Sequence, residues 1–282
     1  MRQILEICKI ARPGFWLTHL WFYLLPFAKQ NMFGLPEFWL GAIYVCFPLG
    51  LLLYGWNDIG DHGTDQLNPR KGSWIFGARP NESMRRRLPW IIGAIQIPFL
   101  ILFVFFSGWK MIGWFAAVLA VNWTYNNLGF KRIAGLDLIN QVGYLLIFVL
   151  ASWLCSVEQL NLPAMIFSSL FAIQSHLFGQ IMDIEQDEID GRRSTSVLIG
   201  AMRSKLLLSV IMLIEAAIAY NYFSGKLVGL FMLAGALFFL ADAFVGPRKY
   251  AVSFVTTFFL AWNLVALVSM YFVWNYGLFL LS

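Results

Sequence analysis

Two acidic segments, far apart along the chain, carry the residues best suited to chemistry. The first runs from Asn57 to Asp65 and the second from Asp183 to Gly191, and they hold three and five of the 15 acidic residues. Each follows an apolar run long enough to cross a bilayer. Carboxylates are costly near lipid, so such clusters usually bind a cation. Oxygen ligands suit Mg²⁺, which often bridges carboxylates to substrate phosphates. The two segments therefore predict a site for a metal-bound diphosphate.

The spacing within each segment allows its carboxylates to share one face of a helix. The predicted metal ligands follow the patterns i, i+3, i+7 and i, i+4, i+7: Asp58, Asp61 and Asp65, then Asp183, Asp187 and Asp190. Carboxylates this close repel one another, and divalent cations remove the repulsion and leave positive charge for a phosphate. Two facing sets fit two or more Mg²⁺ ions that clamp one diphosphate. The plain alternative is a solvated acidic loop, or carboxylates that simply pair with adjacent arginines.

The elements that must position these segments are membrane-spanning helices. Sixty per cent of the residues are hydrophobic and only 12% are charged, and the mean hydropathy is +0.69. Nine apolar spans are expected at roughly 14–31, 37–56, 88–108, 110–128, 136–157, 162–182, 204–223, 226–246 and 250–275. We therefore expect an all-α polytopic membrane protein, with about nine transmembrane helices around a central apolar chamber and a single domain over residues 1–282.

Basic residues are distributed unevenly between the two sides of the predicted bundle. Of the 20 Lys and Arg residues, all but Lys29, Lys110 and Lys226 fall on the side of the N-terminus. Because basic loops favour the cytoplasm, the N-terminus and both acidic segments are expected on the cytoplasmic side of a multi-pass protein. The net charge of +5 thus reflects topology, and no nucleic-acid partner is expected.

The other polar residues give weaker signals. The three cysteines and the three histidines show no ligand spacing, which argues against a disulfide framework and a zinc site. Glu215 and Asp242 lie inside the seventh and eighth predicted spans. Both are expected to pair with a neighbouring helix.

The acidic segments also resemble the signatures of a known family. The spacing Asn57-Asp58-x-x-Asp61-x-x-x-Asp65 resembles the NDxxDxxxD motif of the UbiA-type intramembrane prenyltransferases. The second segment is similar to the DxxxD motif of that family, and Gly191–Gly200 is similar to its G-x-K/R-S-T-x-x-L-x-G stretch. The resemblance covers the whole chain in order, length and number of spans.

Three further stretches bear on this resemblance. The Arg12-Pro13 pair matches the family, and Arg12–Leu17 is similar to its carotenoid-elongating branch. Tyr125 and Lys131 are six positions apart, whereas many members have a Tyr-x-x-x-Lys element. Residues 68–77 replace the Arg-Pro-Leu/Ile-x-x-Gly stretch of many members, so the acceptor-side details of a ubiquinone-type enzyme are missing.

The resemblance implies Mg²⁺-dependent transfer of an isoprenyl group from an allylic isoprenyl diphosphate to a hydrophobic acceptor, within the membrane lipid. It assigns one Mg²⁺ site to Asp58, Asp61 and Asp65 and the other to Asp183 and Asp187, with Asp190 as a further ligand or proton acceptor. Asn57 is expected to bind the diphosphate or to complete the metal shell. It implies that basic residues neutralise the leaving diphosphate: Arg12, Arg70, Lys71, Lys131 and Arg192. Tyr125 is expected near the allylic cation. The acceptor is left open among aromatic rings, quinone precursors and isoprenoids.

Two alternatives remain at this stage. A membrane terpene cyclase of the same superfamily uses the same metal and diphosphate chemistry without an acceptor. A divalent-cation transporter also places carboxylates in membrane helices, usually near mid-span. Because both acidic segments lie at helix ends beside basic residues, an anionic ligand held through metals is favoured over a cation path.

Overall fold

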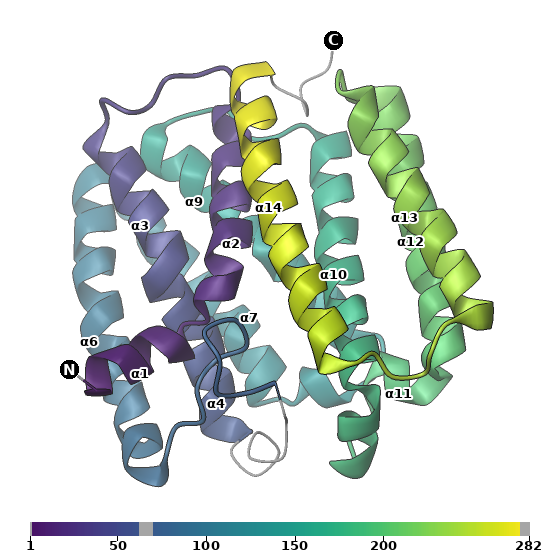
Figure 1. The fold of residues 1–282 in the computed structure, drawn as a ribbon. Coiled ribbons are helices and arrows are strands. Elements are labelled where there is room, and N and C mark those ends of the chain that lie inside the picture. The colour runs from purple at the N-terminus through teal and green to yellow at the C-terminus, as the bar shows by residue number, and fades with distance from the viewer. Residues whose placement is uncertain (1, 62–69, 277–282) are drawn as a thin grey trace.

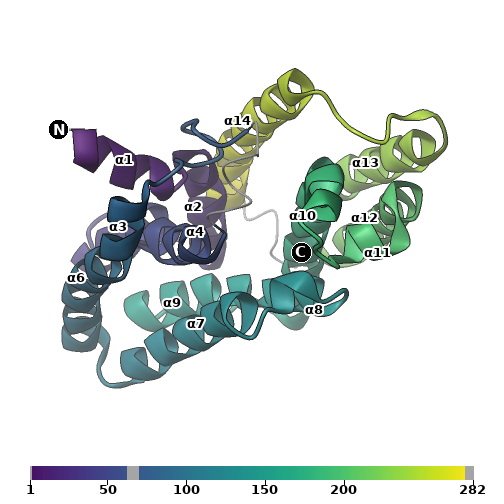
Figure 2. The same cartoon turned by 90° about the horizontal axis from the view of Figure 1, so that it is seen from below.

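The computed structural model describes residues 2–61 and 70–276, which form helices and, within those ranges, no β-strand. The helices stand roughly side by side in one bundle, with the short helix α1 (Arg2–Ile10) lying across one end (Figure 1). Seen from that end, the helices are arranged roughly in a ring (Figure 2). This arrangement agrees with the predicted all-α fold.

Six segments of the described chain are long and apolar enough to cross a membrane. Each overlaps a predicted span, although α6 begins earlier and α10 ends later than predicted. They are Pro36–Gly60, α6 (Glu82–Ser107), Leu136–Cys155, α10 (Leu162–Ile189), α13 (Lys226–Val245) and α14 (Val252–Tyr276). The other three predicted spans also form helices, which are not among these six: α2 (Trp16–Leu24), α7 (Lys110–Asn126) and α12 (Ala201–Tyr222). The predicted count of nine is therefore not established by these helices alone.

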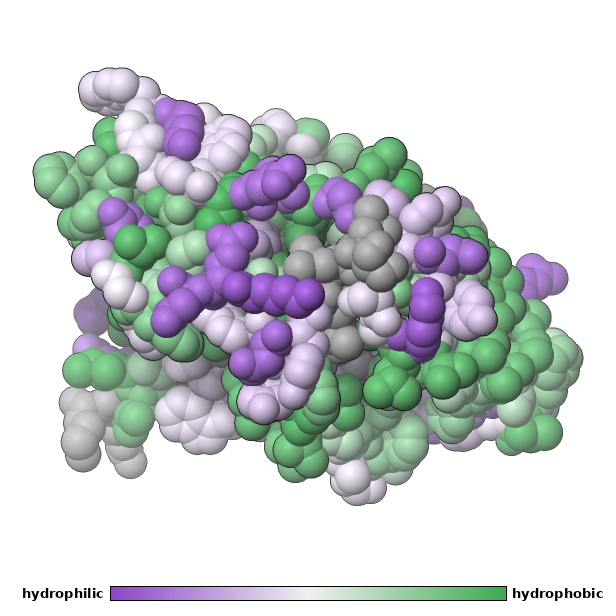
Figure 3. Space-filling view, turned by 90° about the horizontal axis from the view of Figure 1, so that it is seen from above, coloured by the Kyte–Doolittle hydropathy of each residue, from purple (hydrophilic) through white to green (hydrophobic). Residues whose placement is uncertain are grey.

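The outer faces of the long helices are apolar, as a lipid environment requires. Trp90, Phe105 and Trp109 project from α6 and the turn after it, and each is more than three-quarters exposed. On the end of the bundle opposite α4 (Trp56–Gly60), hydrophilic residues gather in patches and apolar residues dominate much of the edge (Figure 3). Polar ends and apolar sides are the pattern of a membrane-embedded bundle.

The span that leads to the first acidic segment has an irregular backbone. It consists of α3 (Pro36–Gly50), the π-helical segment η3 (Leu51–Gly55) and α4. Pro48 cannot donate a backbone hydrogen bond, and a π-helical turn also breaks the regular ladder of the helix. Side chains of neighbouring helices bond carbonyls here: Gln96 donates to Pro48 (2.8 Å) and Asn122 to Leu52 (3.1 Å). The irregular turn is therefore held by α6 and α7.

Shorter helices make up the rest of the helical structure in the described chain. They are η1 (Pro13–Phe15), η2 (Leu25–Phe27), η4 (Phe130–Arg132), α8 (Leu136–Ile139), η5 (Asn140–Leu145), α9 (Leu146–Cys155) and α11 (Thr195–Ile199). Two of the loops meet through a parallel bridge between Ile133 and Arg193. This contact brings the segment after α7 beside the segment after α10.

Candidate active site

A cavity of about 860 Å³ lies among the helices, and most of the predicted site residues border it. Eleven of them do so: Arg12, Asn57, Asp61, Arg70, Lys71, Tyr125, Lys131, Asp183, Asp187, Asp190 and Arg192. Asp58 is fully buried just behind this wall. Asp65 lies outside the described residues. The structure thus gathers polar residues that are widely separated in the sequence.

Asp58 is fixed by two basic residues from different segments. Its Oδ1 accepts hydrogen bonds from Arg12 (3.0 Å) and Lys71 (2.7 Å). Its Oδ2 is buried and has no hydrogen-bond partner among the described residues. A buried carboxylate oxygen without a partner is costly. This oxygen is therefore suited to binding a ligand, and a metal ion is a ligand that a carboxylate oxygen can coordinate.

Arg12 reaches Asp58 from a backbone conformation that is uncommon for a residue other than glycine. Its φ is 48°, in the left-handed region. Its guanidinium lies over the ring of Tyr54, 4.6 Å from the ring centre. Gly77 makes room for it, since a Cβ at that position would lie 3.1 Å from Arg12 Nε. Local strain that the surroundings maintain in this way is typical of functional sites.

Asp61 lies just after α4, whose helical geometry ends at Gly60. The predicted one-face helical pattern of the first segment therefore extends only from Asp58 to the helix end. The Asp61 carboxylate accepts a hydrogen bond from Lys131 (2.8 Å) and lies 3.3 Å from Arg192. Burial raises the pKa of Asp61, but these two cations outweigh burial and hold it below its ordinary value. Asp61 is therefore ionised at neutral pH.

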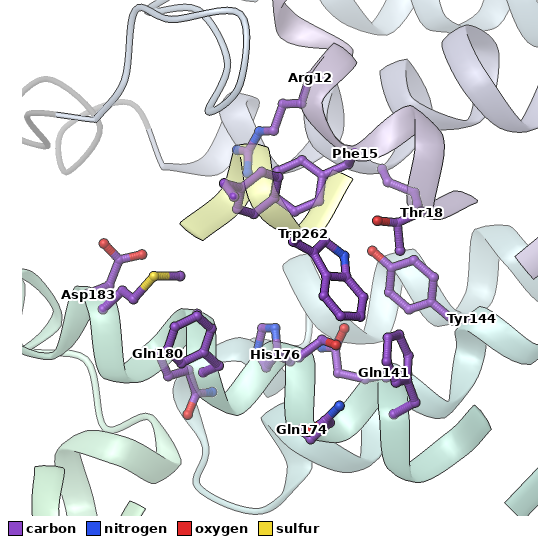
Figure 4. Close-up of a pocket in the computed structure, with 18 of the residues that line it drawn as sticks. Arg12, Phe15, Thr18, Gln141, Tyr144, Gln174, His176, Gln180, Asp183 and Trp262 are labelled. Carbon is purple, nitrogen blue, oxygen red and sulfur yellow. The ribbon is translucent and has the colours of Figure 1, made fainter. Parts of the chain in front are cut away.

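The second acidic segment follows the helical prediction more closely. Asp183 and Asp187 lie on α10, which continues to Ile189, and Asp190 caps it. Arg70 donates to Asp183. Asp187 accepts a hydrogen bond from Ser194 (3.2 Å) and lies 3.7 Å from Arg192. In Figure 4, Asp183 lies at one end of the row of cavity-lining residues on α10.

The acidic residues between these aspartates have other partners. Glu185 pairs with Lys249 (2.8 Å) and Glu188 with Arg248 (2.6 Å), both in the loop before α14. None of these four residues borders the cavity. The helix thus directs one acidic face into the cavity and uses another to bind the α13–α14 loop.

Basic residues connect the two acidic segments in a reciprocal way. Arg70, which follows the first segment, binds Asp183 of the second. Arg192, which follows the second segment, lies near Asp61 of the first. Burial acts to lower the pKa of Arg192, but the carboxylates of Asp61 and Asp187 raise it above its ordinary value. The pairing with arginines left open by the sequence does occur, but among the described pairs Arg192 and Asp187 alone are near neighbours in the chain. These pairs therefore assemble a site as well as neutralise local charge.

Three further polar residues singled out in the sequence are Tyr125, Asp242 and Glu215. Tyr125 borders the cavity, and its hydroxyl lies 3.5 Å from His176 Nε2. Asp242 pairs with Lys205 (2.7 Å), as predicted. The predicted pairing of Glu215 is not seen, because neither of its buried carboxylate oxygens has a hydrogen-bond partner among the described residues.

Sequence reasoning missed Asp137, which is fully buried beneath the loop after α10. Its carboxylate accepts hydrogen bonds from the Thr195 backbone (2.7 Å), the Thr195 hydroxyl (2.5 Å) and Gln180 (2.6 Å). Asp137 thus holds the start of α11 against α10, three residues beyond Arg192. Asp137 is the second residue of the span predicted at 136–157, and nothing in the sequence distinguishes it there from an ordinary helix-capping aspartate.

Within residues 2–61 and 70–276, no group of three His, Cys, Asp or Glu side chains is placed to hold a metal ion. The carboxylates of the two segments are instead bridged by Arg and Lys. The donor set still fits Mg²⁺, because it consists of carboxylate oxygens and includes the unpartnered Oδ2 of Asp58. Asp58 and Asp61, with Asp183 and Asp187, are the residues that would hold it.

The site thus combines paired carboxylates and cations at one end of a cavity inside a helical bundle with membrane-spanning helices. Residues 15–264 match the UbiA prenyltransferase family. The chain belongs to this family and is an integral membrane prenyltransferase.

Similar proteins are found among both characterised relatives and solved structures. The chain is 27% identical over 227 residues to a lycopene elongase/hydratase of Corynebacterium glutamicum, covering 77% of each chain. It is 27% identical to another lycopene elongase/hydratase, from Haloarcula japonica, covering 77% of this chain and 74% of that one. The fold is similar to a UbiA homolog from Archaeoglobus fulgidus bound to DMAPP and Mg²⁺, with a TM-score of 0.69, 16% identity and coverage of 95% and 98%.

Proposed function

We propose that this protein transfers an isoprenyl group from an allylic prenyl diphosphate to a linear isoprenoid acceptor, with Mg²⁺ and with release of diphosphate. The observation that carries the proposal is the convergence of both acidic segments and five basic residues on one cavity. The acceptor class is supported by the lycopene elongases among the relatives. The structural neighbour with DMAPP and Mg²⁺ supports the donor and the metal.

The basic residues are placed to take over the diphosphate charge. Arg12, Lys71 and Lys131 each bind a carboxylate that the metal would also use. With Mg²⁺ held by these carboxylates, the three cations would be available to phosphate oxygens, for which Arg and Lys are the usual partners. Bound Mg²⁺ supplies positive charge that stabilises the departing diphosphate. The protein holds the leaving group at the charged end and excludes water from the allylic carbon.

The cavity wall beyond the charged end is suited to a hydrocarbon tail and an allylic cation. It includes the aromatic rings of Phe15, Tyr144 and Trp262, which Figure 4 shows around the same space. Aromatic faces attract cations, while apolar walls give water no favourable place from which to attack. We propose that this cavity is the central apolar chamber predicted from the sequence, and that Tyr125 lies near the cation.

The number of membrane spans and their orientation are part of this proposal. We propose that α2, α7 and α12 also span the bilayer, which gives nine helices in a single domain over residues 1–282. The N-terminus and both acidic segments then face the cytoplasm, because the basic residues concentrate on their side. Cysteine accessibility at Lys29 and Arg86, each replaced by Cys in intact cells, tests this orientation: only the former is expected to react from outside.

The function is tested with the purified protein in detergent, dimethylallyl diphosphate, lycopene and Mg²⁺. We expect diphosphate release and a prenylated carotenoid, both lost with a chelator and with Asp183→Asn. Glu185→Gln is the matched control, since Glu185 lies two residues away and pairs outside the cavity. Metal-independent transfer, or full activity of Asp183→Asn, would contradict the proposal. Cyclic hydrocarbon from geranylgeranyl diphosphate without acceptor would indicate the cyclase instead, and Mg²⁺ flux into liposomes without diphosphate release would indicate the transporter.

A further inference from the structure

Three polar side chains stand together in the wall of the cavity, deeper than the charged end. They are His19 on α2, Tyr54 on η3 and Tyr144 on η5, and all three border the cavity. The His19 and Tyr54 rings are stacked with centres 5.9 Å apart, and the Tyr144 ring lies 5.9 Å from His19. Polar groups in a membrane interior are costly, and their presence usually marks function.

The hydrogen bonds of His19 determine which of its nitrogens carries the proton. Nδ1 lies 3.0 Å from the carbonyl oxygen of Val45, and a carbonyl can only accept. Nδ1 therefore carries the proton, and in the neutral ring Nε2 has the lone pair. Nε2 lies 3.3 Å from the Tyr54 hydroxyl, so that hydroxyl donates to it. His19 is therefore a neutral base that accepts a hydrogen bond from the phenol of Tyr54.

The backbone places this pair next to the proposed leaving-group site. Tyr54 precedes Asp58 by four residues, which on a helix is about one turn or 6 Å. The π-helical segment that contains Tyr54 is a feature that occurs frequently at functional sites. Arg12, which binds Asp58, also lies over the Tyr54 ring. Tyr54 is thus one helical turn deeper than the carboxylate that would bind the metal.

We propose that Tyr54 and His19 accept the proton that the prenylated acceptor must lose, an inference that rests on the proposed function. When the donor C–O bond breaks, diphosphate leaves with the electron pair. The acceptor alkene then forms the new C–C bond, which leaves a cation on the acceptor. A neighbouring C–H bond breaks, its electrons form the new alkene, and its proton passes to the Tyr54 oxygen. Tyr54 simultaneously gives its own proton to His19 Nε2, so His19 becomes an imidazolium.

This transfer creates no new charge in the apolar interior. The positive charge moves from carbon to the His19 ring, where the Val45 carbonyl accepts from Nδ1 and the rings of Tyr54 and Tyr144 lie within 6 Å of its centre. Tyr144 also interacts with the Tyr54 side chain. The alternative base is the departed diphosphate, which is held at the charged end with the basic residues.

The test compares products at constant consumption of the donor. Tyr54→Phe and His19→Asn are assayed with dimethylallyl diphosphate, lycopene and Mg²⁺, measuring diphosphate release and the distribution of carotenoid products. Asn keeps a donor for the Val45 carbonyl but is not a base. We expect diphosphate release within a few-fold of wild type. The share of the wild-type alkene relative to isomers and water adducts should fall on the order of 10²-fold, the lower end of general-base contributions.

Tyr44→Phe is the matched control, because Tyr44 is a fully buried tyrosine of the same span whose hydroxyl donates to Gln96 away from the cavity. It should reproduce the wild-type product distribution. An unchanged distribution in Tyr54→Phe would overturn the proposal and leave diphosphate as the base. Parallel loss of release and product in both variants would also overturn it, because that is the result of a structural role. Failure of the proposed function itself is distinguishable, since wild type would then release no diphosphate.

Discussion

The two acidic segments have similar sequences but are held in different ways. In the first, Asp58 and Asp61 are buried and each is bound by two basic residues, at the end of an irregular span. In the second, Asp183 lies on the regular helix α10, and about a third of its side chain is exposed. Asp58 and Asp61 are therefore part of the folded interior, whereas Asp183 lies closer to the surface than Asp187, which is buried further along α10. We therefore expect substitutions in both segments to lower activity, but those at Asp58 and Asp61 to lower stability more than those at Asp183.

The largest effect is expected at Asp58. Asp58→Asn should abolish activity, and it removes the buried carboxylate that both Arg12 and Lys71 bind. Breaking a buried ion pair by removing one partner costs about 3–5 kcal/mol. Thermal unfolding in detergent and diphosphate release measure the two losses. A variant that is inactive yet as stable as wild type would remove the distinction between the segments.

Asp183→Asn should lower activity on the order of 10²-fold or more, the scale expected for loss of transition-state charge stabilisation. Its effect on stability should stay below about 1 kcal/mol, as for partly exposed ion pairs. The same two assays apply, with Glu185→Gln as the control on the same helix. Destabilisation as large as that of Asp58→Asn would show that both segments are equally structural.

A substitution of Asp137 tests whether the second segment depends on the hydrogen bonds that hold the start of α11 against α10. Asp137→Ala removes the acceptor of three hydrogen bonds from Thr195 and Gln180. We expect a loss of roughly 2–3 kcal/mol, typical of hydrogen bonds to a charged group. Activity should fall about tenfold because Arg192 loses its alignment. Asp137→Asn should recover part of both, and identical behaviour of the two variants would contradict this role.

The smallest effect is a dependence on pH. Because the pKa of Asp61 is lowered in the folded protein, its ion pairs stabilise the fold above the unfolded value of about 3.9. That contribution is lost as the pH falls through the lowered pKa. Melting temperatures measured from pH 6 to about pH 3 should fall more steeply for wild type than for Asp61→Asn. Equal slopes would show that Asp61 gains nothing from Lys131 and Arg192.

Much of this arrangement follows from the sequence because hydrophobic length and carboxylate spacing are local properties. The span expected at 162–182 extends to Ile189 in α10, which carries Asp183 and Asp187 on a helix as predicted. The UbiA-type motifs also identified the family correctly. Membrane helices are read well from sequence since their backbone groups must be satisfied internally.

Other features depend on contacts between distant segments and could not be predicted. Nothing local indicates that Arg70 binds Asp183 or that Pro48 precedes a π-helical turn. His19 was set aside because no metal ligands are spaced around it, yet its mid-span position was itself a signal. Its partner, Tyr54, is identified only by the fold.

The central claim is that the two acidic segments form one diphosphate site. Binding of inorganic pyrophosphate in the presence of Mg²⁺, measured by calorimetry on the purified protein, tests it through the stoichiometry. The account predicts one pyrophosphate per chain, lost entirely in Asp58→Asn and equally in Asp183→Asn, and retained in Glu185→Gln. Two pyrophosphates per chain, with each substitution removing only one, would contradict it.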